Sequence, residues 1–416
     1  MSGSARLTFA WLGSLTTLVL AGAGLAILAG RQLSSAEYSA FIAFTAVSGV
    51  LVQGVGGAVE QHTLLHTRFG SRRGNNPIVR VSVVSYLIIV VVMTLPIADW
   101  QDRFFDPLSK HVVAAVIIGA PTLFATCIIR GRLTARGFVA ESGRSILILS
   151  VLTIGLPITL RVFGASWASA MIFGQAIAWG APSLYLMKFR HKPGQVQSEE
   201  LSREVGLERR SSLFVFNNLL LLSSLLSSQI VVKATSVDLS SDEIAQSQLI
   251  ISLSCLTATL GLGVTPLILA RVPTSVINSR GRFLVRIVVP GAVISVLAVG
   301  MIALLCEPLI RLIIGDAMVL DGKEVLVLSL PGSLLTISVL LNSFFITNSM
   351  ILKAVTGWAF GLLALWLPPS LLTPDSVISA ATIILGSTVF LFLVHVIGFL
   401  IGRTHNHSVA QGELGN

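Results

Sequence analysis

The sequence predicts an all-α integral membrane protein of about twelve transmembrane helices, built as two six-helix lobes related by a parallel repeat. Three observations lead to this fold class. Hydrophobic residues make up 54% of the 416 residues and charged residues 11%, whereas a soluble domain carries about 25% charged residues. Apolar stretches of about twenty residues, long enough to cross a bilayer as a helix, recur along the whole chain. A short polar motif also occurs twice, at an offset close to half the chain length.

The N-terminal half contains six such stretches. A single positive charge, Arg6, precedes the first one, which is longer than the core of a secretory signal and is therefore expected to remain as an uncleaved span. Polar segments that carry most of the charges separate the others, and the fifth stretch has room to begin earlier than residue 145. The six predicted spans are 9–30, 38–59, 79–97, 112–129, 145–160 and 166–187.

The C-terminal half follows the same plan after a charged segment at 188–211. A polar turn separates its first two spans, and the segment from Cys306 to Glu324 separates the third from the fourth. These connections are short, so no domain outside the membrane is expected to hold an active site. The predicted spans are 212–232, 244–269, 284–305, 325–346, 351–368 and 377–401.

The repeated motif links the two halves. Its first copy is Leu33-Ser34-Ser35-Ala36-Glu37-Tyr38, its second is Leu239-Ser240-Ser241-Asp242-Glu243-Ile244, and the offset is 206 residues. At this offset Ser48 aligns with Ser254, and Gly57 aligns with Gly263. Because six spans is an even number, both halves enter the membrane in the same orientation. The repeat is therefore parallel, about an axis along the membrane normal.

The charges predict the orientation. With the N-terminus inside, 21 of the 28 Lys and Arg residues fall on the cytoplasmic side and 12 of the 19 acids on the other side. This bias follows the positive-inside rule and supports the count of spans. The predicted organisation is an N-terminal lobe at 1–187, a cytoplasmic linker at 188–211, a C-terminal lobe at 212–402 and a cytoplasmic tail at 403–416.

Several function classes are excluded or disfavoured. Motifs of zinc proteases, serine hydrolases and nucleotide-binding loops are absent, so neither an enzyme nor an ATP-driven pump is expected, and no cofactor. The net charge of +9 fits cytoplasmic loops, and no basic arm interleaved with aromatic residues suggests nucleic acid as a partner. His62 and His66 share a helix face, but a closed metal site needs three or four ligands, so no metal is expected.

Four charged residues are candidates for function. Glu60, at the inner end of the second span, would load a coupling proton or cation, or would simply face water. Arg31 and Lys233 end the first and seventh spans beside the two hinges, where they would hold a phosphate or act as interfacial anchors. Lys353, at the start of the eleventh span, is a further candidate for an anion.

Uncharged polar side chains are frequent in some spans. A lipid-facing amide would leave its donors unsatisfied, so most of these groups should face protein or a wet cavity. Hydrogen bonding between helices is the alternative explanation. The best cavity candidates lie on the seventh span, and the predicted substrate-binding amides are Gln53, Asn217, Asn218, Gln229 and Asn342.

Three runs resemble the polysaccharide-flippase branch of the multidrug/oligosaccharidyl-lipid/polysaccharide (MOP) exporter superfamily. They are Gly30–Tyr38, Arg130–Arg144, and Glu307-Pro308-Leu309-Ile310-Arg311-Leu312-Ile313-Ile314-Gly315-Asp316. The resemblance implies two lobes in a V around a central cavity. It also implies alternating access that moves a polyprenyl-pyrophosphate-linked oligosaccharide from the cytoplasmic to the outer leaflet of a bacterial inner membrane, for export of cell-surface polysaccharide.

The same resemblance implies the partners. Membrane lipid and the lipid-linked glycan would bind the chain, and a polysaccharide polymerase or glycosyltransferases would be its protein partners. Related flippases have cationic cavities, whereas few charges lie deep in these spans. The pyrophosphate would then depend on Arg31, Lys233 and Lys353, and the sugars on the amides.

Two alternatives remain at this point. A cation-coupled multidrug antiporter of the same superfamily would share the fold and would need a buried acid, for which Glu60 is the candidate. A transporter of the major facilitator type would explain Arg68-Phe69-Gly70-Ser71-Arg72-Arg73, although Thr67 stands where the acid of that family's loop would be. A membrane glycosyltransferase would need catalytic carboxylates and usually a large outer loop, and the sequence contains neither.

Overall fold

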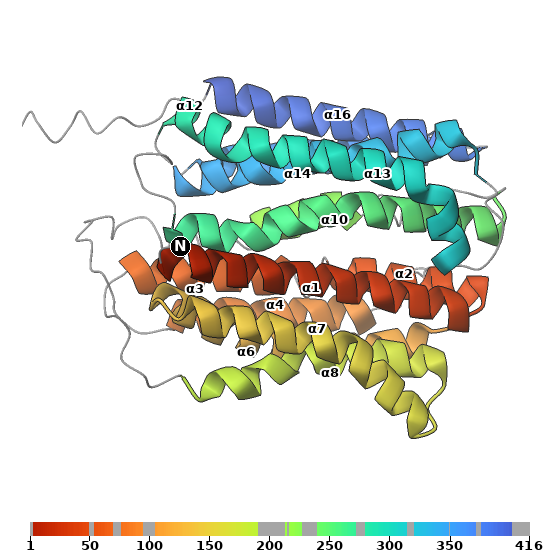
Figure 1. Cartoon of the computed structure of the whole chain (residues 1–416), viewed down its shortest axis with the longest axis horizontal. Coiled ribbons are helices and arrows are strands. Elements are labelled where there is room, and N and C mark those ends of the chain that lie inside the picture. Colours follow the sequence, from red (N-terminus) through yellow and green to blue (C-terminus); the bar gives the residue numbers. More distant parts are fainter. Residues whose placement is uncertain are drawn as a thin grey trace, which may run out of the picture.

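A computed structural model gives the fold and describes residues 3–49, 54–69, 76–94, 105–189, 213, 216–226, 239–271, 279–313, 320–348, 350–371 and 376–401. Every structural statement below concerns these residues. Within them the chain is helical and contains no strand, which confirms the all-α class. Most of the helices run roughly side by side along the long axis of the molecule (Figure 1).

The N-terminal half forms helices at all six predicted spans. The second span is seen as two helices, α2 and α3, and residues 50–53 between them lie outside the described part. The fifth helix begins six residues before the predicted residue 145, in line with the freedom expected there. The helices are α1 (Gly3–Gln32), α2 (Ser35–Ser48), α3 (Val55–Phe69), α4 (Asn76–Thr94), α6 (Ser109–Ala135), α7 (Val139–Val162) and α8 (Trp167–Met187).

The C-terminal half also forms helices at its six predicted spans. The ninth span is a continuous run in which a π-helical turn, η3, separates α12 from α13; such turns are local irregularities of a helix. The described helices are 216–226, α10 (Ser241–Arg271), α12 (Arg280–Phe283), η3 (Leu284–Val288), α13 (Val289–Ile313), α14 (Gly322–Thr347), α15 (Ile351–Leu371) and α16 (Val377–Ile401).

Length and composition identify a multi-pass membrane protein. Six helices of the described part are long and apolar enough to cross a bilayer, and four shorter apolar helices accompany them. Many large apolar side chains on these helices are exposed, for example Val162, Leu304 and Ile401. Lipid contact accounts for such exposure, which would be costly in water.

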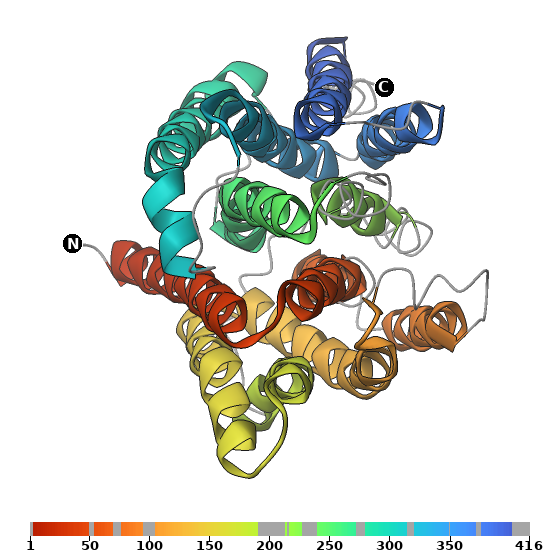
Figure 2. The same ribbon diagram turned by 90° about the vertical axis from the view of Figure 1, so that its right-hand side faces the viewer.

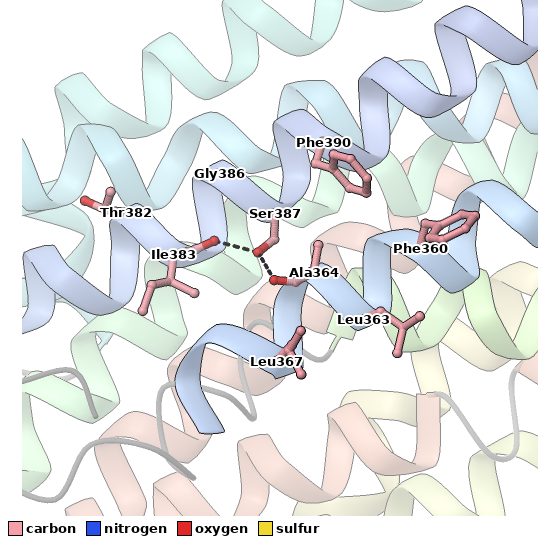
Figure 3. Close-up of a pocket in the computed structure, with 9 residues that line it drawn as sticks. All are labelled: Phe360, Leu363, Ala364, Leu367, Thr382, Ile383, Gly386, Ser387 and Phe390. Atoms are coloured by element: carbon pink, nitrogen blue, oxygen red, sulfur yellow. Dashed lines mark hydrogen bonds between the residues drawn. The ribbon is translucent and has the colours of Figure 1, made fainter. Parts of the chain in front are cut away.

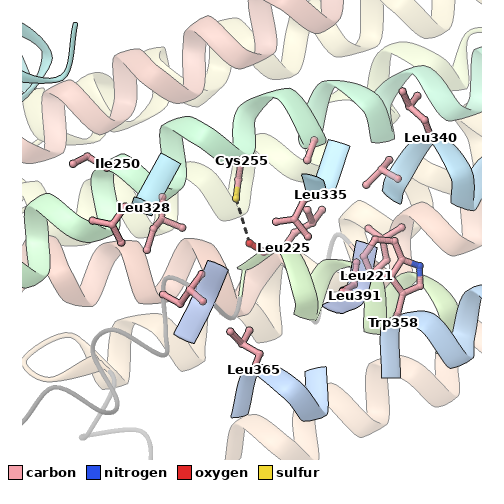
Figure 4. Packing of buried hydrophobic residues seen from close by; sticks show 14 of the residues in the cluster. Leu221, Leu225, Ile250, Cys255, Leu328, Leu335, Leu340, Trp358, Leu365 and Leu391 are labelled. Carbon is pink, nitrogen blue, oxygen red and sulfur yellow. Dashed lines mark hydrogen bonds between the residues drawn. The ribbon is translucent and has the colours of Figure 1, made fainter. Parts of the chain in front are cut away.

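The two halves pack as separate bodies with separate cores. Helices α1 to α8 occupy one side of the molecule and α10 to α16 the other, and the end-on view shows the same division (Figures 1 and 2). One buried apolar cluster comes almost entirely from the first half, and a second comes from the C-terminal half. In the second cluster, Leu225 accepts a 3.6 Å hydrogen bond from Cys255 through its backbone carbonyl (Figure 4).

The two copies of the repeated motif begin their helices in the same way. Ser34 accepts a hydrogen bond from the Glu37 backbone N–H at 3.4 Å, and Glu37 accepts one from the Ser34 backbone N–H at 3.0 Å. Ser240 and Glu243 repeat this arrangement at 3.2 and 2.8 Å. Both are capping boxes, which satisfy free N–H groups at a helix start. The predicted internal repeat is therefore visible as one local structure used twice.

These hinges lie at one end of the bundle, where α1 and α13 end and α2 and α10 begin. We call it the hinge end; the charge distribution predicts that it faces outward. Here Ser35 donates a 3.0 Å hydrogen bond to Asp242, which joins the two hinges. Gly30 also lies so close to α13 that a Cβ on it would be 2.5 Å from the Ile313 carbonyl oxygen. The two halves thus touch directly at this end.

Within the C-terminal half, α10 and α14 pack closely along their length. A Cβ on Gly332 would lie 2.1 Å from the Ser254 carbonyl oxygen. Further along, Thr336 donates to Thr257 at 2.9 Å, and the hydroxyls of Thr265 and Ser343 lie 2.9 Å apart. The contacts advance together along both chains, so the two helices run parallel.

Candidate functional site

One face of α3 contacts α6 and carries a buried ion pair. Arg130 of α6 donates from Nε to Glu60 Oε1 at 2.8 Å and from Nη2 to Glu60 Oε2. The side chains are 16% and 5% exposed, respectively. Two parallel N–H···O bonds of this kind are the strong, geometrically specific way in which a guanidinium binds a carboxylate.

Small residues allow the close approach of these two helices. A Cβ on Gly131 would lie 2.6 Å from the Glu60 carbonyl oxygen and 3.1 Å from Thr63 Cβ. One turn earlier, Gly56 lies against Cys127. Gly56, Glu60 and Thr63 are spaced four and three residues apart, so they share one helix face. That face places the Glu60 carboxylate within reach of Arg130.

A second face of α3 and its continuation in α2 contact the helix at 216–226. Leu226 packs at Gly49, Leu222 packs at Gly54, and the Asn218 amide nitrogen would lie 3.6 Å from a Cβ on Gly57. Residue numbers rise on one side while they fall on the other, so the helices are antiparallel. The next position on this face of α3 is Gln61, four residues after Gly57.

The helix at 216–226 lies between the halves. Asn218 faces α3, whereas Asn217 is in line with Leu221 and Leu225, which belong to the core of the C-terminal half. The two amides are both buried, and Asn217 Nδ2 is 3.5 Å from Asn218 Oδ1. They therefore place polar groups at the junction of the two halves.

Several acceptors here have no hydrogen-bond partner among the described residues. They are Gln61 Oε1, Thr63 Oγ1 and Asn217 Oδ1, and the three side chains are 4%, 0% and 0% exposed. A buried polar atom without a partner is costly, so such atoms indicate a missing donor. We call Glu60, Gln61, Thr63, Arg130, Asn217 and Asn218 the α3 site.

Arg31 does not belong to the α3 site; it lies at the hinge end. Its Nε and Nη2 donate to the carbonyls of Leu312 and Arg311 at 2.8 and 2.7 Å. A cation at the carboxyl end of a helix is favourable because the carbonyls there carry partial negative charge. Arg31 thus holds α13 in this structure, and its predicted role in phosphate binding stays a prediction.

The other predicted residues are spread more widely. Asn342 is buried in the C-terminal half, where it accepts a 3.2 Å hydrogen bond from Trp358 Nε1. Trp358 also packs against the buried His395, with ring centroids 4.5 Å apart. Lys353 is exposed at the start of α15. Gln53, Gln229 and Lys233 lie outside the described residues.

The sequence did not identify Arg130 or Gln61 as site residues. The predicted fourth span ends at residue 129, which places Arg130 among the charges of the cytoplasmic loop. In the structure α6 continues to Ala135, so Arg130 remains on the helix and turns toward α3. Its position just beyond an apolar stretch, at the start of the Arg130–Arg144 run, is the available signal.

A groove between α15 and α16 has a different character. Its volume is about 560 Å³, and apolar side chains such as Phe360, Leu363 and Phe390 line it (Figure 3). Its Ser387 hydroxyl already donates to the Ala364 and Ile383 carbonyls. The groove therefore has the chemistry of a surface for hydrocarbon and lacks groups that would recognise a hydrophilic cargo.

Neither a protein-family model nor a characterised protein matches the chain by sequence. Solved structures do match it over nearly its whole length. A MATE transporter in the straight conformation gives a TM-score of 0.64 at 15% identity, covering 95% of this chain and 94% of that chain. An outward-facing multidrug resistance MATE family transporter of the MOP superfamily gives 0.63 at 15% identity, covering 95% and 93%.

A third structure is a MOP superfamily transporter from Pyrococcus furiosus, described as having a binding pocket of reversed polarity that suggests a different function. It gives a TM-score of 0.61 at 14% identity and covers 95% of this chain and 93% of that chain. Transporters of this fold have been solved in outward-facing and inward-facing conformations. The chain therefore has the twelve-helix fold of the MATE transporters of the MOP superfamily.

Proposed function

We propose that this protein carries a polyprenyl-pyrophosphate-linked oligosaccharide from the cytoplasmic to the outer leaflet of a bacterial inner membrane by alternating access. The observation that carries the proposal is that the buried Glu60 carboxylate is already paired with a cation. Among the described acidic residues it is the buried one, and Arg130 neutralises it. A carrier of cations would be expected to keep a buried carboxylate free for its cargo or coupling ion.

The other described acids lie at helix ends and have structural roles or solvent contact. Glu37, Glu243 and Glu324 complete capping boxes. Glu307 pairs with Arg311 at 2.7 Å on an exposed surface. These positions favour helix starts and surface contacts over binding of a positively charged cargo in the membrane interior.

The polar groups of the α3 site suit a glycan. Sugars present many hydroxyl donors, and the site holds unpartnered oxygens on Gln61, Thr63 and Asn217. Amide side chains that contact hydroxyls through both donor and acceptor groups are well matched to such a ligand. Arg130 adds a guanidinium, the group that recognises phosphate with two parallel hydrogen bonds.

Multidrug export is the second candidate. It is favoured by the fold itself, because a matching structure is described as a multidrug resistance transporter. One neighbour of the same fold is described as having reversed pocket polarity and a different function, so the fold alone does not determine the cargo. The state of Glu60 is our reason for preferring an anionic, hydroxylated cargo.

Depletion of the protein in its host tests the proposal. The gene is repressed, lipids are extracted, and polyprenyl-linked glycans are compared by mass spectrometry with leaflet-selective labelling. We expect one lipid-linked glycan to accumulate in the cytoplasmic leaflet and to return to normal on complementation with the wild type or with Glu307→Gln. Unchanged glycans together with altered efflux of cationic compounds would contradict the proposal and favour the multidrug candidate.

A further inference from the structure

We propose that Glu60 occupies the anion-binding position of Arg130 in the empty transporter, and that a phosphate of the cargo takes its place when Glu60 is protonated. The inference rests on the proposed function and assigns it an anion site whose occupation is linked to the uptake of a proton. The Glu60 carboxylate would then act as an internal stand-in for the substrate. One proton would be taken up for each cargo molecule bound.

The geometry supports an exchange of one anion for another. Arg130 presents Nε and Nη2 to the two oxygens of Glu60. Two oxygens of a phosphate match the same pair of donors, because the guanidinium fork fits both anions. The Arg130 side chain is 16% exposed while that of Glu60 is 5% exposed, so the cation is the more accessible partner.

Burial explains why the exchange requires a proton. When phosphate displaces the carboxylate from Arg130, Glu60 is left in a buried position without a cation. An unpaired buried charge is strongly unfavourable, whereas a protonated carboxyl can remain there as a hydrogen-bond donor. The carboxylate therefore takes one proton, and the guanidinium stays protonated and donates its two hydrogen bonds to the phosphate.

The surroundings favour an anion. The helices that pack around this end of α3 bring mostly cations, and the described helix at 216–226 brings no titratable group. Glu141 is the acid among them, at the start of α7. The titratable and charged groups that the sequence places on α3, α4, α6, α7, α10 and α15 near this end are His62, His66, Arg68, Arg80, Cys127, Arg132, Arg136, Glu141, Arg144, Arg271 and Lys353.

Neighbouring atoms extend the site beyond the phosphate. Thr63 lies on the same face of α3 as Glu60, and its hydroxyl has no partner among the described residues. Gln61 of α3 and Asn217 of the helix at 216–226 also have amide oxygens without a partner among the described residues. A phosphate on Arg130 would bring the hydroxyl groups of an attached sugar toward these oxygens, which have no hydrogen-bond donor among the described residues.

Binding of a defined probe by the full-length protein in lipid nanodiscs tests the inference. The probe is a short-chain prenyl pyrophosphoryl-sugar, whose bridging diester carries no proton that titrates near neutral pH. For the wild type we expect affinity to rise about tenfold for each unit by which the pH falls, because binding is linked to uptake of one proton. Proton uptake is measured independently by calorimetry in buffers of different ionisation enthalpy.

The variants distinguish exchange of Glu60 for a phosphate on Arg130 from an ion pair that only joins α3 to α6. Glu60→Gln should bind the probe at least tenfold more tightly than the wild type near neutral pH, without proton uptake and without dependence on pH. Arg130→Gln should bind at least tenfold more weakly. The double variant Glu60→Gln/Arg130→Gln leaves no unpaired charge at this position and serves as the folding control. Glu307→Gln removes an exposed ion pair with Arg311 and should leave probe binding unchanged.

Two results would overturn the inference. One is weaker binding by both single variants; the other is wild-type binding without proton uptake. If either occurs while depletion still causes a lipid-linked glycan to accumulate, the proposed function stands and the exchange at Arg130 fails. If no variant binds the probe and depletion changes no glycan, both fail together.

Discussion

Ser35 donates a hydrogen bond of 3.0 Å to Asp242, and this bond joins the two copies of the repeated hinge. The residues occupy neighbouring positions of the same motif, one in each half of the chain. Alternating access requires the halves to separate at one end while they close at the other. The contact therefore reports whether the hinge end is closed.

A cross-link between these positions should stop transport. In Ser35→Cys/Asp242→Cys, a short bis-methanethiosulfonate reagent is expected to join the two side chains through disulfides and abolish transport, and reduction of these disulfides should restore it. The three native cysteines are buried and are expected to react slowly. Transport that continues at the normal rate after complete cross-linking would show that the hinge end does not open.

Arg31 is expected to stabilise the closed hinge end. Arg31→Ala removes the hydrogen bonds to the Leu312 and Arg311 carbonyls, an interaction of about 1 kcal/mol at an exposed helix end. The open population should rise about fivefold, which a membrane-impermeant thiol reagent would detect as faster labelling of Ser35→Cys.

The matched control for this measurement is Arg161→Ala. Arg161 lies at the same end of the molecule, but it donates to Ala165 and packs over Trp167 within its own half. Its loss should leave the labelling rate unchanged. Equally faster labelling in both variants would indicate a general loosening of the structure. An unchanged labelling rate in Arg31→Ala would show that Arg31 does not stabilise the closed hinge end.

Asn218 is expected to be required for cargo and not for folding. Leucine has the same number and branching of side-chain heavy atoms, and the contact that it removes is a long one of 3.5 Å with Asn217 Nδ2, so the loss of stability should be small. Asn218→Leu should therefore keep its melting temperature and lose transport by at least tenfold. Gln175→Leu, in the half-buried part of α8, is the control and should transport normally; normal transport by Asn218→Leu would contradict the site assignment.

Gly332 is expected to be essential for packing of the C-terminal half. A methyl group would fall 2.1 Å from the Ser254 carbonyl oxygen, a backbone atom that cannot rotate away. Gly332→Ala should destabilise the protein by about 1–3 kcal/mol, as overpacked cores do. Gly300→Ala meets no atom within 4 Å and should be neutral or slightly stabilising, which thermal unfolding in detergent would show.

The spans and the hinges could be predicted because their signals are local. Apolar length alone places the helices, and the Ser-x-x-Glu spacing within each hinge is the pattern of a capping box. The parallel repeat followed from counting spans. These features depend on residues close in sequence, so one chain is enough to show them.

The α3 site could be predicted only in part because it depends on contacts between distant helices. The sequence indicated Glu60, Asn217 and Asn218 as polar groups in apolar spans. The partner of Glu60 is 70 residues away, and its helix extends further than its apolar stretch suggests. The glycines that bring α3 close to two neighbours are visible in the sequence, but a single sequence does not show which helices they contact.

The contact between the hinges is asymmetric, and this has a consequence for the origin of the chain. The residue that corresponds to Asp242 in the first half is Ala36, and the one that corresponds to Ser35 in the second half is Ser241. An ancestor with two identical halves would have formed this bond twice or not at all. The asymmetry of the contact is therefore a product of divergence between the two copies, by gain of one bond or by loss of the other.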